Sequence, residues 1–173
     1  MANCFGLIFL AGIVFVQTAT AQIKPGPVYR LGATVSFGLS KITSNHVGIG
    51  GIVGAEKMVS KHFAAEAEAS YNYFTGDKAI YVDAKNKSYT IPVLAGIKMY
   101  PLSNVYASLR AGAINFLLNN MSSARVQFGY GAAAGINLSP KTQRLNVQLS
   151  YTGFRYDGIS RGYATLAVAI IIK

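Results

Sequence analysis

The chain has 173 residues, of which 51% are hydrophobic and only 13% are charged, and its formal net charge is +10. This length corresponds to one domain, and so much apolar material with so few charges excludes a disordered chain. The single cysteine excludes a disulfide scaffold, and no apolar run after residue 21 reaches the roughly 18 residues that a transmembrane helix needs.

The first residues are typical of a secretory signal. The segment 1–21 has no charged side chain, and its apolar run Phe5–Val16 leads to Ala19-Thr20-Ala21, a small-x-small cleavage pattern. A membrane anchor is the alternative, but this run rises only about 18 Å as a helix, whereas a bilayer core is roughly 30 Å thick. We therefore expect a signal peptide at 1–21, a short lead-in at 22–27 and a folded domain at 28–173.

From Val28 onward, apolar and polar side chains alternate with a period of two, which predicts β-strands. Between Tyr29 and Ser40, the apolar face carries Tyr29, Leu31 and Val35, while Arg30 and Thr34 lie on the other face. The same alternation occurs at 63–73, 88–99, 127–137 and 145–152, and less regularly at about 48–58, 105–116 and 162–172. The pattern predicts eight strands, most of about ten residues or more.

The expected connections alternate in length. Those at 59–61, 101–104 and 139–144 are tight, and the others are longer on average, with the longest at 75–86. Short turns at one end and longer loops at the other are typical of a membrane β-barrel. Cleavage of the signal leaves the N-terminus in the periplasm, so the lead-in, the tight turns and the C-terminus are expected on that side.

The two faces of the strands distinguish two kinds of barrel. A lipocalin-type soluble barrel turns its charged face outward, whereas a barrel in lipid turns its apolar face outward. Strand length, alternating loop lengths and tyrosines near the strand ends favour lipid. An unpaired backbone group in hydrocarbon costs several kcal/mol, so the last strand must pair with the first. The predicted fold is all-β: a closed, eight-stranded, antiparallel, up-and-down transmembrane β-barrel.

Two stretches carry a family resemblance: Ile91–Lys98, and Phe128–Gly131 followed by Gly135–Asn137. With the eight-strand pattern, they make the chain similar to the small outer-membrane β-barrels of Gram-negative bacteria, of the OmpX-like and OmpA-transmembrane-domain-like type. The resemblance implies residence in the cell outer membrane and insertion by the barrel-assembly machinery, but no specific activity. Such barrels usually end in an aromatic residue, whereas this chain ends in Ile170-Ile171-Ile172-Lys173.

Two groups of charged residues are candidate sites. Six inward-pointing charges near the tight-turn end are expected to plug the lumen, with Arg30 paired to Glu56, Glu66 to Lys98, and Glu68 to Arg110. The other group comprises basic residues near the long loops, which we expect either to contact lipopolysaccharide phosphates or to form a solvated rim. Its members are Lys78, Lys85, Lys87, Arg125, Arg155 and Arg161.

Catalytic, cofactor-binding and metal sites are not expected. His46, which lies beside Ser44 and Asn45, and His62 fall at opposite ends of the predicted barrel and cannot share a site, and no His-x-Ser-Asn-type stretch is present. The residues 129–134 match a G-x-G-x-x-A dinucleotide motif, but that motif must open a helix, and here it lies in a predicted strand. Nucleic acid is not an expected partner, because the chain is exported and has no basic cluster interleaved with aromatic residues.

The sequence favours a non-enzymatic integral outer-membrane protein with a structural, adhesive or surface-interaction role. Its partners would be outer-membrane lipid and lipopolysaccharide. The alternative is a narrow pore for water or small solutes, and a lipid A-modifying enzyme is less favoured.

Overall fold

The computed structural model describes residues 26–39, 47–74, 88–118, 125–138, 144–156 and 158–172. These ranges form eight strands: β1 (Val28–Gly38), β2 (Val47–Met58), β3 (Phe63–Phe74), β4 (Ser88–Met99), β5 (Val105–Leu118), β6 (Arg125–Leu138), β7 (Leu145–Tyr156) and β8 (Ile159–Ile172). The expected signal peptide at 1–21 lies outside the described residues. Within the described ranges, no helix is long and apolar enough to cross a membrane.

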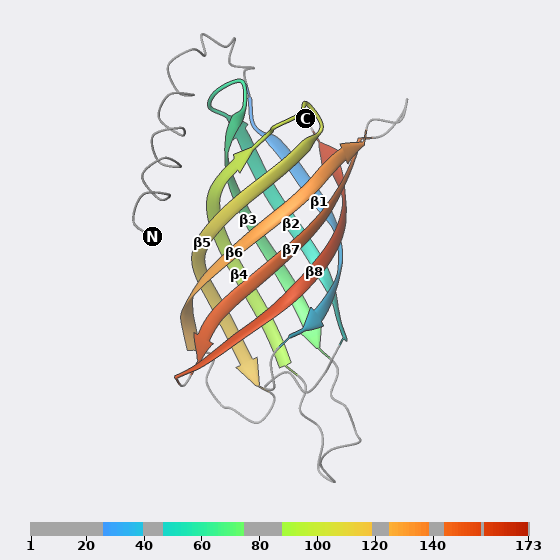
Figure 1. Cartoon of the computed structure of the whole chain (residues 1–173). Coiled ribbons are helices and arrows are strands. Elements are labelled where there is room, and N and C mark those ends of the chain that lie inside the picture. The colour runs from blue at the N-terminus through green and yellow to red at the C-terminus, as the bar shows by residue number, and fades with distance from the viewer. Residues whose placement is uncertain are drawn as a thin grey trace, which may run out of the picture.

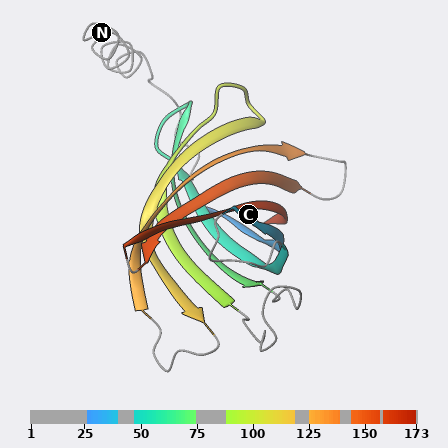
Figure 2. The same ribbon diagram turned by 60° about the horizontal axis from the view of Figure 1, so that its bottom comes forward.

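Each strand pairs antiparallel with its neighbours in sequence, and β1 also pairs with β8. The closing ladder runs from Tyr29 opposite Ile172 to Gly38 opposite Tyr163. The strands are tilted around a common axis, and the view toward the lower end shows them arranged in a ring (Figures 1 and 2). The predicted closed, eight-stranded barrel is confirmed.

The strand ends define the two ends of the barrel. β2, β4, β6 and β8 end at the top of Figure 1, which we call the short-turn end, and the turns 59–62 and 100–104 lie there. β1, β3, β5 and β7 end at the opposite end, which we call the long-loop end.

The connection between β7 and β8 is shorter than expected. Only residues 157 and 158 separate these strands, β8 begins at Ile159 rather than near residue 162, and Tyr156 pairs with Ile159. Gly158 has a φ of +79°, a left-handed conformation that glycine adopts without steric cost. The expectation of a longer loop after the seventh strand is therefore wrong, because a two-residue hairpin with glycine in the turn joins the strands directly.

The barrel is polar inside and apolar outside. In β1, Leu31 is 60% exposed and Phe37 is 44% exposed, whereas Arg30 and Thr34 are each 3% exposed. The same alternation runs through β3, β4 and β7. In water this arrangement would expose the apolar face of every strand, so the outer face is suited to lipid, as the alternation predicted.

The interior has two chemically different halves. Charged and polar side chains fill the half toward the short-turn end, as expected. The half toward the long-loop end contains an apolar cluster, which lies beside buried polar residues such as Ser36, Asn72 and Thr90. The cluster consists of Phe74, Leu94, Ile114, Phe116, Phe154, Tyr156 and Tyr163. Most of these residues lie close to the ends of β3, β5 and β7 or to the start of β8, and the cluster is not among the features predicted from the sequence.

Candidate functional site: the barrel lumen

Six ionisable side chains meet inside the short-turn half because each occupies an inward position on one of the first five strands. We call them the charge cluster. Three cations and three anions form it: Arg30 from β1, Glu56 from β2, Glu66 and Glu68 from β3, Lys98 from β4 and Arg110 from β5. Equal numbers of opposite charges leave the cluster formally neutral, which favours its burial.

Glu66 is the centre of the cluster. Its carboxylate lies 3.2 Å from Arg30 Nη2, 3.2 Å from Lys98 Nζ and 3.9 Å from Arg110 Nε. The Glu66 side chain is completely inaccessible to solvent, as is that of Lys98. A single anion therefore holds three cations from three different strands, and it links the two sides of the barrel.

The structure confirms two of the three expected pairs. Glu66 contacts Lys98, and Glu68 pairs closely with Arg110. The third expected pair, Arg30 with Glu56, is wrong: Arg30 contacts Glu66 at 3.2 Å and Glu68 at 3.5 Å, while Glu56 contacts Lys98 at 2.5 Å. The expectation relied on the adjacency of β1 and β2, but side chains this long reach across a narrow lumen.

Uncharged side chains complete the network. Arg30 Nη1 donates a hydrogen bond to Gln148 Oε1 at 2.9 Å, and Gln148 Nε2 donates one to Glu68 Oε2 at 3.1 Å. The Tyr106 hydroxyl lies 2.9 Å from Gln148 Oε1, and the Tyr106 ring lies 4.1 Å from Lys98 Nζ, a cation–π contact. These residues connect β5 and β7 to the charges of β1, β3 and β4.

The sequence contains a signal for the inward position of Tyr106. Tyr106 of β5 lies opposite Gly135 of β6, and a Cβ atom at Gly135 would lie 2.4 Å from the Tyr106 hydroxyl oxygen. The glycine therefore leaves the space that the ring occupies. An inward glycine on one strand beside an inward tyrosine on the next would have predicted this packing.

Tyr100 closes the short-turn side of the charge cluster. It lies just beyond β4, is 7% exposed, and donates a hydrogen bond of 2.8 Å to Glu56 Oε1. Burial, together with the nearby Glu56 carboxylate, raises the pKa of the Tyr100 phenol above its ordinary value. The phenol therefore stays protonated in the neutral range and remains a hydrogen-bond donor.

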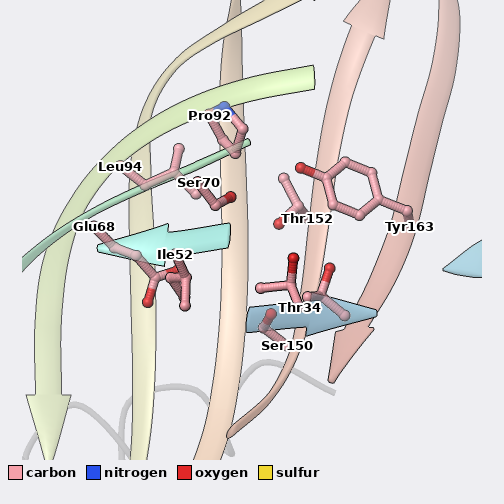
Figure 3. A pocket seen from close by; sticks show the side chains of 10 residues that line it. Thr34, Ile52, Glu68, Ser70, Pro92, Leu94, Ser150, Thr152 and Tyr163 are labelled. Atoms are coloured by element: carbon pink, nitrogen blue, oxygen red, sulfur yellow. The ribbon is translucent and has the colours of Figure 1, made fainter. Parts of the chain in front are cut away.

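A small cavity separates the two halves of the lumen (Figure 3). Its volume is about 10 Å³, and it is lined on one side by Glu68 and Ser70 and on another by Thr152 and Tyr163. A volume of this size is sufficient for roughly one water molecule. The lumen therefore contains an isolated small space here, and the packed charge cluster and the apolar cluster lie on either side of it.

The expected contact between Arg161 and lipopolysaccharide at the surface is wrong. The position of Arg161 in the sequence predicts a surface residue that contacts lipopolysaccharide or belongs to a solvated rim, but its side chain is only 7% exposed and lies inside the barrel. Its guanidinium carbon lies 4.6 Å from the centre of the Tyr156 ring and 5.1 Å from that of Phe116. The error arose because β8 starts earlier than expected, so that Arg161 belongs to a strand, at an inward position, and not to a loop.

The structure describes only some of the other basic residues that were expected to contact lipopolysaccharide. Arg155 is exposed, and its Nε donates a hydrogen bond to the Gly158 carbonyl oxygen at 3.1 Å. Arg125 is the first residue of β6. Lys78, Lys85 and Lys87 lie outside the described residues. Contact with lipopolysaccharide phosphates remains a prediction for all of these residues.

The dinucleotide-like motif and the two histidines were the sequence features examined for catalysis or cofactor binding. Gly129 and Gly131 lie in the interior of strand β6, so the dinucleotide motif does not open a helix, as expected. His62 lies in the turn before β3, with Nδ1 3.2 Å from the Tyr100 carbonyl oxygen. His46 lies outside the described residues. Across the described ranges, no group of three His, Cys, Asp or Glu side chains could hold a metal ion.

The family model for the outer membrane protein beta-barrel domain matches residues 7–169. The chain belongs to this family. Its apolar outer face is therefore the surface that meets the lipid of the outer membrane. A comparison with curated proteins found no match.

Solved barrels share the fold at low sequence identity. Neisserial surface protein A is 13% identical with a TM-score of 0.61, over 86% of this chain and 97% of that one. The N-terminal barrel domain of Pseudomonas aeruginosa OprF is 14% identical with a TM-score of 0.56, over 84% and 97%. Ail, the attachment invasion locus protein of Yersinia pestis, is also 14% identical, with a TM-score of 0.55 over 84% and 97%. At these identities the similarity shows the fold alone.

Proposed function

We propose that this protein is a non-enzymatic, non-conducting outer-membrane barrel that supports surface interactions through its long-loop end. In this proposal the short turns and both termini lie in the periplasm. The protein would act as a rigid membrane-spanning support for its loops, and its lumen would contribute stability and not transport.

The observation that carries this proposal is the filling of the lumen. The charge cluster occupies the short-turn half, the apolar cluster occupies the other half, and the cavity between them has a volume of about 10 Å³. A continuous path for hydrated ions needs a water-filled lumen, as in the much wider porins. The six long charged side chains and five buried aromatic rings inside this eight-stranded barrel support a lumen without such a path.

Electrical recording in planar bilayers tests the closed lumen. We expect the purified protein to give no steady conductance. Glu66→Ala, which removes the anion at the centre of the charge cluster, serves as a variant in which the packing is deliberately opened. Sustained, ion-selective channels from the unmutated protein would contradict the proposal and favour the narrow pore.

The proposed interaction is with anionic surface groups, because the net charge is +10 and the segment between β3 and β4 contains Lys78, Lys85 and Lys87. Ail, which shares the fold, has also been crystallised with the heparin analogue sucrose octasulfate, a polyanion. Lipopolysaccharide phosphates and sulfated sugars both offer charged oxygen acceptors to lysine and arginine.

A charge-neutralised variant tests this interaction. Replacement of Lys78, Lys85 and Lys87 by glutamine should weaken binding to lipopolysaccharide and to heparin, and binding of the unmutated protein should fall with added salt. The matched control replaces Lys61, Lys141 and Arg144 by glutamine, which removes the same charge from the short-turn end. Equal loss in both variants would show that net charge alone, and not the long-loop end, attracts the anions.

A further inference from the structure

The pairing of β3 with β4 is interrupted at one place in the barrel wall. On the β3 side, the ladder stops after Ala69 and resumes at Asn72, and the register is the same before and after this gap. In that register Ser70 would lie opposite Pro92. On the other edge of β4, Pro92 is paired with Ile114 of β5, and the ladder continues without a gap.

The interruption identifies a backbone acceptor that lacks its donor in the ladder. A hydrogen-bonded pair of an antiparallel ladder exchanges both of its N–H···O bonds, so the N–H and the carbonyl of one residue are directed at the same neighbouring strand. Only the pairing with β3 is broken, so the backbone of Pro92 is directed at Ser70. Proline has no N–H. The Ser70 carbonyl oxygen therefore loses the ladder donor that another residue type at position 92 would supply.

The small cavity in the lumen adjoins these same two residues. Ser70 and Pro92 both line it, with Thr152 and Tyr163 on another side (Figure 3). Its volume is about 10 Å³. A cavity of roughly 10–15 Å³ is the smallest that holds a water molecule, which also needs two to four polar partners. The hydroxyl groups that line the cavity supply such partners, and almost all buried backbone carbonyls find a donor.

The charges around the cavity favour a neutral occupant. Glu68 is the charged residue of its lining, but this carboxylate already contacts Arg110 and Arg30 and accepts a hydrogen bond from Gln148. The charge cluster contains three cations for three anions, so a metal cation beside it would leave an uncompensated positive charge in the interior. The volume excludes any molecule much larger than water.

We propose that one water molecule occupies this cavity and donates a hydrogen bond to the Ser70 carbonyl oxygen, in place of the missing N–H of residue 92. Its remaining hydrogen-bonding capacity is used by the hydroxyl groups around the cavity. The water is then a component of the barrel wall, and it explains how a proline is accommodated in a strand that has a neighbour on both sides. This inference concerns the wall and is independent of the proposed surface interaction.

A crystal structure at a resolution that shows ordered water tests the site directly. We expect one water molecule within hydrogen-bond distance of the Ser70 carbonyl oxygen and of a hydroxyl group that lines the cavity. A soak with thallium(I), an anomalous scatterer that replaces small monovalent cations, should give no signal there. A Ser70 carbonyl bonded to a protein group, a cavity without ordered water, or an anomalous signal in the cavity would each overturn the proposal.

Pro92→Val tests the link between the water and the proline. Valine has a similar size and supplies the N–H, so we expect the ladder to continue through residue 92, with the Ser70 carbonyl oxygen bonded to that N–H and no longer to water. A ladder that stays open in this variant, with water still bound to Ser70, would show that the proline does not create the site.

A cavity-filling variant tests the contribution of the water to stability. Thr152→Ile extends a side chain into the cavity, and Thr152→Val is the matched control that removes the same hydroxyl group without added volume. In urea-induced unfolding, Thr152→Ile should lower the midpoint further than Thr152→Val does. This extra loss should become smaller in the Pro92→Val background, because the restored N–H then supports the Ser70 carbonyl. An equal extra loss in both backgrounds would overturn the proposal, since crowding alone would explain it.

Discussion

Replacing Glu66 by glutamine should destabilise the barrel more than the same change at any other carboxylate of the charge cluster. Glutamine keeps the volume and an acceptor oxygen but removes the charge that Arg30, Lys98 and Arg110 share. Three buried cations then face only Glu56 and Glu68. Loss of one member of a buried ionic group costs about 3–5 kcal/mol because a charge is left uncompensated. The two remaining anions still contact Lys98 and Arg110, so we expect the lower value, about 3 kcal/mol.

Glu68→Gln is the matched control on the same strand. Glu68 contacts two of the three cations, Arg110 and Arg30, and is 9% exposed, so its loss should cost less, about 2 kcal/mol. A double variant, Glu66→Leu with Lys98→Met, removes one charge of each sign from the two least accessible side chains. It should recover much of the stability lost in the single variant, because well-packed apolar residues can replace a buried ion pair.

Urea-induced unfolding in phospholipid vesicles measures these differences, with the mobility shift between folded and unfolded barrel as the readout. The reasoning fails if Glu66→Gln loses less than about 1 kcal/mol, or if it loses no more than Glu68→Gln. It also fails if the double variant is no more stable than Glu66→Gln, because the cost would then come from disturbed packing and not from the uncompensated charge.

Three further outcomes follow from the fold. Ala67→Arg, near the middle of the outer face of β3, should lower the free energy of unfolding in a bilayer by about 2–4 kcal/mol. Ala107→Arg, near the short-turn end of β5, should lower it by at most about 1 kcal/mol. Equal free energies of unfolding for the two variants would contradict the placement of the outer face in lipid. On intact cells, protease should cut within 75–86 and spare 139–144, and the reverse pattern would invert the proposed topology. Gly158→Ala should lower the free energy of unfolding by about 1 kcal/mol, because alanine is strained at a φ of +79°, and an unchanged value would show that this turn readily rearranges.

The strands and their faces could be predicted from the sequence because lipid and lumen impose opposite demands on alternate residues. In β4, the outward residues Val93 and Ile97 are 56% and 62% exposed, and the inward residue Lys98 is fully buried, as the alternation predicted. The period of two survives in most strands because a shift of one residue would expose charges to hydrocarbon. Whether a side chain suits lipid or lumen depends on that residue alone, so the pattern can be recognised in a single sequence.

The apolar cluster in the lumen was missed because the type of residue and its position in the strand give opposite indications. Phe74, Phe116 and Phe154 are apolar but point inward, and each is at most 3% exposed. Counting by twos from the inward residues Asn72, Arg110 and Thr152 places all three inside, but the strands predicted at 63–73 and 145–152 ended before Phe74 and Phe154. Which side chains they meet there depends on other strands, as with Arg161 near Phe116 and Tyr156.

The pairing within the charge cluster was predictable only in part for a related reason. Adjacency of strands correctly predicted the contact between Glu66 of β3 and Lys98 of β4, but it failed for Arg30. Arg30 of β1 bypasses Glu56 of β2 and reaches β3 and β7. Within a lumen this narrow, all inward side chains at one height are neighbours, so strand order limits their partners much less than it does on an open sheet.

The packing of the lumen also bears on where function can reside. A side chain that contacts three others from different strands cannot move without the loss of several contacts at once, so the interior around Glu66 favours one arrangement. The outer face has a different character, because the pairing of β3 with β4 is interrupted at Pro92. Variation in sequence and shape is therefore tolerated more readily on the outer surfaces of this barrel than around Glu66, while the lumen keeps the strands in place.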